Sequence, residues 1–336
     1  MITSDGMERL KRLQRKVAAA GLDCLLMGSR DAFDANTFYY SGDSTPPKAL
    51  LVMPDDAFCF SHPKQEVVGF ENVEMRHFKK QLTDFAKKHR VKKLGVDMHS
   101  DLAFAAFYVE NATHVSFVKQ LLALREIKDD GELQALRFAQ DVTKQCVSEA
   151  LEEGIYGRTE NEVAGILELK ARTRGFSLSA FEPIVLANER AAVPHGKPTQ
   201  YRIRKGDCVI VDVGVRAMGY CGDFSTTIYE GGNNGLRDAV SAVKEAKAAA
   251  TKKAKAGIIG SELRDAALRI LYEYGFKDVS FSAVGLSLGH QIGLDVHEGA
   301  TRLEKTKLRK GLAFTIEPGI YVGGKYGVRF EDVMLL

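Results

Sequence analysis

The chain has 336 residues, which is too long for one ordinary domain and about right for two. Its net charge of +3 is close to balance, so nothing in its composition favours binding to nucleic acid or to a membrane surface. The N-terminal segment lacks the apolar stretch of a signal peptide, and no apolar run approaches the ~20 residues of a membrane-spanning helix. Five scattered cysteines indicate a reducing compartment, so we expect a cytoplasmic protein.

Short strand and helix patterns alternate through residues 1–122, which predicts a small α/β domain. The expected elements, in chain order, are a helix at 7–20, a buried strand ending near Gly28, a hairpin at 49–54 and 57–60, a helix at 80–90 and a strand at 92–98.

Residues 123–336 show a different order, in which two helices and then strands occur twice. Asp130 is the expected N-cap of a helix that ends at Gly154, and Thr159 to Glu162 form a capping box. That second helix stops at Gly175, and strands follow at 183–187, 208–215 and 219–229. The repeat consists of helices at 236–256 and from Ser261 to Gly275, and of strands at 279–285, 312–322 and 328–336. This order predicts a pseudo-symmetric domain with a central sheet and outer helices.

Four acidic residues of the second domain lie in apolar, strand-like segments: Asp212, Asp223, Glu317 and Glu331. Each alone has an ordinary interpretation, such as a turn residue or, for Glu331, a salt bridge with Arg329. Four acidic residues in apolar strand-like segments are more than an ordinary domain contains. A buried carboxylate is costly unless it is paired or bound to a metal, so the set as a whole indicates a site.

His290 follows Gly289 in SLGHQIGLDVHEG and completes a set of four carboxylates and one imidazole. Such a set suits divalent Mn²⁺, Co²⁺ or Zn²⁺. Two metal ions would neutralise the crowded acids and could bind and deprotonate a water near neutral pH. The sequence therefore predicts a two-metal hydrolytic centre.

The pattern resembles the pita-bread metallopeptidases, which include prolidase, aminopeptidase P and methionine aminopeptidase, with creatinase as a metal-free relative. The resemblance implies an α+β fold: a pita-bread catalytic domain with a pseudo-twofold repeat, preceded by a smaller creatinase-type α/β domain. The segments that carry it are LREIKDDGELQALRFA, AAVPHG, VIVDVGV, GYCGDFSTT, SLGHQIGLDVHE, GLAFTIEPGIYV and GVRFEDV.

The resemblance also implies roles for individual residues. Asp212 is expected to chelate one metal ion, Asp223 and Glu331 to bridge both, and His290 and Glu317 to hold the second. Glu317 is also the expected general base. Two further residues, His195 and His297, are expected to contact the substrate and to stabilise charge on its carbonyl oxygen.

Three departures from the family pattern bear on substrate preference. Thr226 stands where the family commonly has Arg, and Gly299-Ala300 follows His297-Glu298 where x-Pro is common. Prolidases grip the free carboxylate of a dipeptide with an Arg near this loop, and Arg302 is the nearest candidate here, although displaced by about one residue. The five predicted ligands are unaffected by these departures.

The resemblance thus implies a peptidase that cleaves the bond before proline, and we expect an Xaa-Pro dipeptidase that forms a homodimer. Aminopeptidase P activity on longer peptides is the alternative within the family, whereas methionine aminopeptidases usually lack the first domain. A metal-free hydrolase like creatinase, or an inactive pita-bread binding module, would be expected to have lost ligands that this chain retains. Metal content separates these two classes from a metallopeptidase.

Overall fold

The computed structural model describes residues 4–43, 45–176, 180–231 and 234–336. It divides into two compact units, Met1–Arg125 and Glu126–Leu336, each with its own core. The boundary expected after residue 122 falls inside helix α4 (Val118–Arg125). Among the described residues, no helix is long and apolar enough to cross a membrane.

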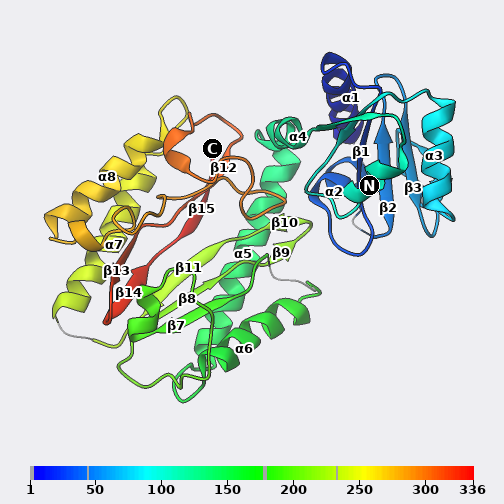
Figure 1. Cartoon of the computed structure of the whole chain (residues 1–336). Helices are drawn as coiled ribbons and strands as arrows, with labels where there is room; N and C mark the ends of the chain where they lie inside the picture. The colour runs from blue at the N-terminus through cyan, green and yellow to red at the C-terminus, as the bar shows by residue number, and fades with distance from the viewer. Residues whose placement is uncertain (1–3, 44, 177–179, 232–233) are drawn as a thin grey trace. The chain divides into compact units, whose positions relative to one another are not determined.

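The first unit is a six-stranded mixed sheet with strand order β4-β3-β2-β1-β5-β6 (Figure 1). Its central strands are buried along their whole length, which explains why they appear as short continuous apolar runs rather than alternating ones. The strands are β1 (Cys24–Ser29), β2 (Lys48–Val52), β3 (Ala57–Ser61), β4 (Glu71–Glu74), β5 (Lys93–Val96) and β6 (Thr113–Ser116). The other helical elements are α1 (Ser4–Ala19), α2 (Ala35–Ser41), α3 (Phe78–Lys88) and the 3₁₀ turn η1 (Ala103–Tyr108).

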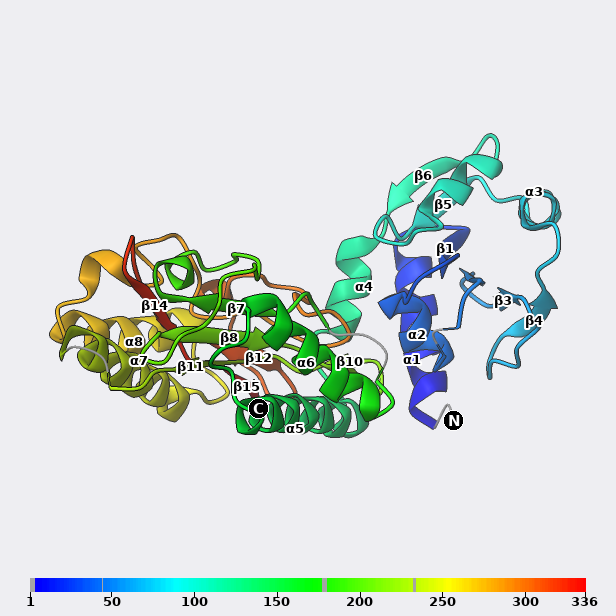
Figure 2. The ribbon, with the colours of Figure 1, turned by 90° about the horizontal axis from the view of Figure 1, so that it is seen from below.

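The second unit contains the predicted double order of two helices followed by strands (Figures 1 and 2). The first half consists of α5 (Asp130–Glu152), α6 (Glu160–Thr173), β7 (Ile184–Ala187), the 3₁₀ turn η2 (Asn188–Ala192), β8 (Val209–Val213), β9 (Arg216–Ala217), β10 (Tyr220–Cys221) and β11 (Phe224–Ile228). The second half consists of α7 (Asn234–Lys253), α8 (Gly260–Glu273), the 3₁₀ turns η3 (Lys277–Val279) and η4 (Leu303–Lys305), β12 (Ala313–Ile316), β13 (Gly319–Val322), β14 (Tyr326–Arg329) and β15 (Asp332–Leu335).

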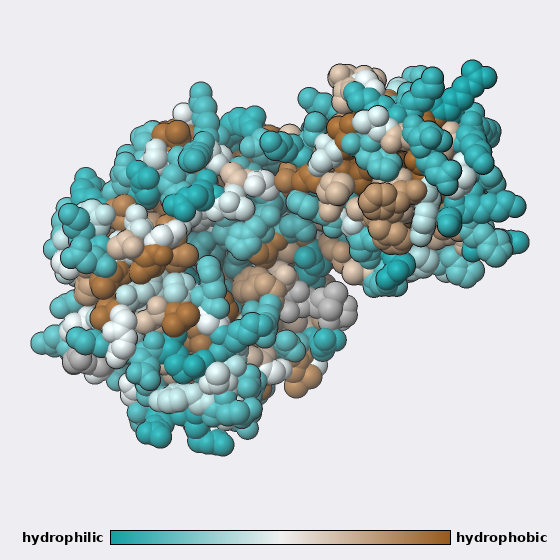
Figure 3. Space-filling view, in the orientation of Figure 1, coloured by the Kyte–Doolittle hydropathy of each residue, from teal (hydrophilic) through white to brown (hydrophobic). Residues whose placement is uncertain are grey.

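Antiparallel pairing joins the strands of the second unit into the order β11-β8-β7 and into the pairs β12-β15 and β13-β14. Strand β11 also lies beside β14, where the hydroxyl of Thr227 accepts from the backbone N–H of Arg329 and donates to its carbonyl. Helices α7 and α8 pack together and bury a largely Ala and Leu surface against the second-half strands. The face of the molecule shown in Figure 3 is mainly hydrophilic.

Several local expectations were wrong in detail. The N-cap of α5 is Asp129, whose carboxylate accepts from the backbone of Glu132 in a capping box. Helix α8 begins at Gly260, with Ile259 rather than Ser261 at the cap position. Residues 279–285 form no strand, because a 3₁₀ turn and then Gly285, at φ +87°, bend the chain there. The predicted capping box of Thr159 and Glu162 is confirmed.

Candidate metal centre

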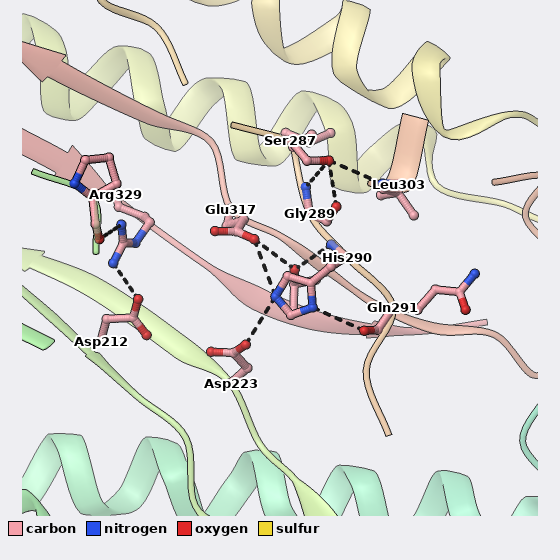
Figure 4. Close-up of polar contacts among 12 residues, drawn as sticks. Asp212, Asp223, Ser287, Gly289, His290, Gln291, Leu303, Glu317 and Arg329 are labelled. Atoms are coloured by element: carbon pink, nitrogen blue, oxygen red, sulfur yellow. Dashed lines mark hydrogen bonds and ion pairs between the residues drawn. The ribbon is translucent and has the colours of Figure 1, made fainter. Parts of the chain in front are cut away.

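Strands β8 and β11 place two carboxylates on one face of their sheet. Asp212 lies in β8 and pairs in register with Ser225 of β11. Asp223 precedes β11 directly, two residues before Ser225, so alternation directs it to the same face. Both acids are almost fully buried and point towards the same space in Figure 4. The hairpin predicted to bring them together is confirmed.

His290 reaches this space from a segment that runs antiparallel alongside β12. Its backbone N–H donates to the hydroxyl of Thr315, and Gly289 allows this approach because a Cβ there would lie 2.0 Å from the carbonyl oxygen of Thr315. Nδ1 lies 3.2 Å from the carbonyl oxygen of Gln291, so it serves as the donor and Nε2 remains available as a ligand. Nε2 lies 3.5 Å from an oxygen of Asp223 and 3.5 Å from an oxygen of Glu317.

Glu317 and Glu331 occupy breaks between strands. Glu317 separates β12 from β13, and its backbone N–H donates to the carbonyl of Leu288. Glu331 separates β14 from β15, and its N–H donates to the carbonyl of Ser225. Ligand atoms of Asp223, His290 and Glu331 all lie within 4.8 Å of one another. Three of the five predicted ligands therefore form one compact cluster, with Glu317 in contact with its histidine.

Asp212 differs from the other ligands because it already has a cationic partner. The Nη2 group of Arg329 lies 2.5 Å from its Oδ2 atom. The same guanidinium donates to the hydroxyl of Tyr321 and to the carbonyl of Pro194. The ordinary interpretation of Glu331, a salt bridge with Arg329, is therefore wrong, since the ion pair is with Asp212. The other oxygen of Asp212 is buried and has no hydrogen-bond partner among the described residues.

Without a metal ion, the crowding and burial of the acids shift the pKa values of several groups in the site. Burial, with repulsion from Asp223, raises the pKa of Asp212 to about 6 even though Arg329 opposes the shift. Burial likewise raises the pKa of Glu317 to about 7 and that of Glu331 well above its usual range. Burial lowers the pKa of His290, but its contacts with Asp223 and Glu317 outweigh that effect and raise the pKa to about 9.

These residues fit divalent cations. Burial and the neighbouring acids raise the pKa of three carboxylates, Asp212, Glu317 and Glu331, and a cation would reverse these shifts. An oxygen of Asp212 also lacks the partner that a buried acceptor requires. The histidine presents its free nitrogen to two of these acids. Oxygen ligands with one imidazole suit Mn²⁺, Co²⁺ or Zn²⁺ rather than softer ions.

His195 and His297 border the cluster. The ring of His297 lies 4.2 Å from that of His290, and partial burial together with the charge of His290 lowers its pKa to about 4. Partial desolvation and the charges of Arg329 and His290 lower the pKa of His195. Both imidazoles are therefore neutral near pH 7, and each can donate one hydrogen bond to a substrate oxygen.

The loop of His195 is anchored by a fully buried carboxylate, Glu160, at the start of α6. Glu160 accepts from the guanidinium of Arg190 and from both the backbone and the hydroxyl of Thr199. These contacts lie on either side of His195 and fix the segment that carries it. Arg302, by contrast, is 55% exposed, donates to the carbonyl of Gly285 and lies 3.9 Å from Glu304, and no contact joins it to the described ligands.

Sequence reasoning considered Arg329 only as a partner of Glu331 and did not single out Tyr321. Arg329 lies two positions before Glu331, and Tyr321 lies four positions after Glu317. In an extended chain, residues an even number of positions apart place their side chains on one face. The even spacing from Glu331 and from Glu317 could therefore have indicated these two residues.

Comparison with known proteins gives matches to two family models. The model of metallopeptidase family M24 matches residues 134–336, and that of the creatinase/prolidase N-terminal domain matches residues 9–127. The chain belongs to metallopeptidase family M24. The predicted family and the predicted α+β fold class are therefore confirmed.

Individual relatives span nearly the whole chain. An Xaa-Pro dipeptidase of Pyrococcus horikoshii is 30% identical over 98% of this chain and 94% of its own length. The structure of an Xaa-Pro dipeptidase from Bacillus anthracis is similar with a TM-score of 0.87 and 28% identity, covering 98% of this chain and 95% of that one. An X-Pro aminopeptidase from Thermotoga maritima has a TM-score of 0.84 and 28% identity, covering 96% of this chain and 95% of that one.

Proposed function

We propose that this member of family M24 is an Xaa-Pro dipeptidase that uses two divalent metal ions, Mn²⁺ or Co²⁺ in the first place and Zn²⁺ as the alternative. The observation that carries the proposal is the buried cluster of Asp223, His290 and Glu331, with Asp212 and Glu317 beside it. Asp212 would hold one ion, Asp223 and Glu331 both, and His290 and Glu317 the other. Full-length similarity to Xaa-Pro dipeptidases supports the substrate class.

The metal ions would supply positive charge that polarises the scissile carbonyl and lowers the pKa of an attacking water. The residues of the chain perform the remaining steps. A carboxylate oxygen of Glu317, whose side chain is 21% exposed, accepts the proton of the water and passes it to the leaving proline nitrogen. His297 and His195 donate hydrogen bonds to the substrate carbonyl oxygen as it gains charge. Arg302 remains the proposed partner of the dipeptide carboxylate.

Aminopeptidase P activity is the second candidate, because an X-Pro aminopeptidase has nearly the same structural similarity. The proposal also includes a homodimer and a cytoplasmic location. All five cysteines are buried and unpaired, which supports a reducing compartment. Light scattering of the purified full chain tests the dimer, and fractionation of the source cells tests the location.

The functional test combines elemental analysis with hydrolysis of Met-Pro and of a longer peptide that begins Xaa-Pro, each with added Mn²⁺ or Co²⁺. We expect about two metal ions per chain, cleavage of Met-Pro, and a fall in kcat of about 10²–10⁴-fold in Glu317→Gln. Cleavage of the longer peptide alone would assign aminopeptidase P. The absence of both metal uptake and cleavage of either peptide would exclude the two-metal mechanism and favour a binding module.

A variant separates dipeptide binding from chemistry. Arg302→Met should raise KM for Met-Pro and leave kcat nearly unchanged, because a contact with a carboxylate whose charge does not change in the reaction contributes equally to substrate and transition-state binding. Arg309→Met, at another exposed arginine of this unit, is the control. Equal KM values for Met-Pro in Arg302→Met and the parent chain would remove Arg302 from the substrate site.

A further inference from the structure

Asp223 has an unusual backbone environment for a buried residue. It stands just before β11, outside the strand ladder, so its N–H and C=O have no strand partner among the described residues. Both groups bond instead to one side chain, Gln140 of α5. The N–H of Asp223 donates to Oε1 of Gln140, and Nε2 of Gln140 donates to the carbonyl of Asp223, both at 2.8 Å. The amide therefore replaces a neighbouring strand at this residue.

The same amide connects to the second proposed bridging ligand. The other hydrogen of Nε2 is donated to Oδ1 of Asp332 at 2.8 Å, so the hydrogen-bonding capacity of the amide nitrogen is fully used. Asp332 is the chain neighbour of Glu331 and forms an ion pair with Lys144 at 2.7 Å. Lys247 donates to the carbonyl of Glu331 at 3.0 Å and lies 3.8 Å from Asp332.

We infer that Gln140 is a positioning residue of the metal centre, which fixes Asp223 directly and Glu331 through Asp332. The inference rests on the proposed ligand set, in which these two carboxylates bridge the metal ions. Gln140 is not itself one of the proposed ligands. It acts on the backbone from which the bridging side chains project, on the helix side of the site.

The burial of each group indicates which of these hydrogen bonds and ion pairs contributes most to the position of Asp223. Gln140 is 5% exposed, so its hydrogen bonds lie out of water and leave unpaired buried groups behind when removed. The side chains of Lys144 and Asp332 are 39% and 29% exposed, and exposed ion pairs contribute little. We therefore expect the amide, not the lysine ion pairs, to control the position of Asp223.

The test titrates the metal-free full chain with Co²⁺ and measures the affinity for Co²⁺ from the change in visible absorption. The temperature is kept well below that of unfolding. Gln140→Met keeps the length of the side chain and removes all three hydrogen bonds. Gln140→Glu keeps one acceptor for the N–H of Asp223 and loses both donors. We expect each variant to weaken Co²⁺ binding about 10–100-fold, the usual effect of removing a group that orients a metal ligand. Lys144→Met should change it about threefold or less.

Controls separate this positioning from folding and from the proposed function. Gln145→Met lies on the exposed face of the same helix and should bind Co²⁺ like the parent chain. Thermal unfolding of each metal-free variant reports loss of stability, which by itself leaves the affinity of the folded protein unchanged. Parent-like affinity in either Gln140 variant overturns the inference. Parent-like affinity and stoichiometry in Asp223→Asn would instead show that the proposed ligand set is wrong.

Discussion

The guanidinium of Arg329 is a buried cation that faces the acids, and its removal should be costly. Arg329→Met leaves Asp212 as a buried carboxylate without its partner, which costs about 3–5 kcal/mol of unfolding free energy at neutral pH. The pKa of Asp212 should rise above its present value of about 6, because Arg329 now lowers it. Urea unfolding of the metal-free protein measures the loss.

Arg309→Met is the control for this variant, since its ion pair with Glu126 involves an arginine that is 53% exposed. An exposed pair of this kind contributes about 0–1 kcal/mol. Equal losses in the two variants would contradict the view that Asp212 depends on Arg329.

Thr226, which stands where the family commonly has Arg, should have little influence on catalysis. It pairs with Val211, whereas its neighbours Ser225 and Thr227 share the face of Asp212, so its side chain lies on the opposite face of the sheet. We expect Thr226→Val to change kcat/KM for Met-Pro by about twofold or less, as for most substitutions away from a site. Ser225→Val, on the ligand face, is the matched comparison and should lower activity more. A large loss in Thr226→Val alone would reverse this assignment of faces.

At the scale of elements, the start of α5 offers a direct test of helix capping. Asp129→Ala removes the side chain that accepts from Glu132 and should cost about 1 kcal/mol of stability without changing kcat. Asp130→Ala, at the position that the sequence suggested as the cap, should cost only a few tenths, because it loses just the interaction with the helix dipole. Chemical denaturation of both variants, at equal metal content, decides between the two positions. A larger loss in Asp130→Ala would contradict the observed cap.

The identity of the proposed ligands was predictable from the chemistry of the sequence, whereas the local secondary structure around each of them was not. Apolar surroundings identified Asp212, Asp223, Glu317 and Glu331, yet only Asp212 lies inside a strand. The segments 312–322 and 328–336 read as continuous strands because the apolar pattern continues through each acid. In the fold each segment changes its pairing partner at the glutamate: β12 pairs with β15, and β13 with β14.

A change of partner depends on residues far apart in sequence, which a local period of two does not encode. The same limit explains why Gln140 was missed. It lies 83 positions before Asp223, on a helix whose apolar periodicity accounts for most of its buried residues. Likewise, the pairing of Asp212 with Arg329 spans 117 positions. The capping box of Thr159 and Glu162 and the order of the helices, which depend on neighbouring residues, were predicted correctly.

For the whole molecule, the crowded acids link stability to pH and to metal. In the folded protein the pKa of Asp212 is about 6 and that of Glu317 about 7, above the values of about 3.9 and 4.3 in an unfolded chain. At pH values between the unfolded and the folded pKa values, the folded chain binds more protons than the unfolded one. The contribution of these groups to the free energy of unfolding is therefore present below pH ~4 and is lost as pH rises through ~7.

Metal binding should oppose this trend, because the ligands must be ionised and His290, whose pKa is about 9, must be neutral. We therefore expect the increase in Tm produced by excess Mn²⁺ to be small at pH 5 and to grow steadily to pH 8. Differential scanning calorimetry with and without Mn²⁺ measures this increase. The double variant Asp223→Asn with Glu331→Gln, which lacks both proposed bridging carboxylates, should show a much smaller increase at every pH. An equal increase in the parent chain at pH 5 and pH 8 would mean that Mn²⁺ binds outside this cluster, since proton competition at the buried carboxylates necessarily makes binding there weaker in acid.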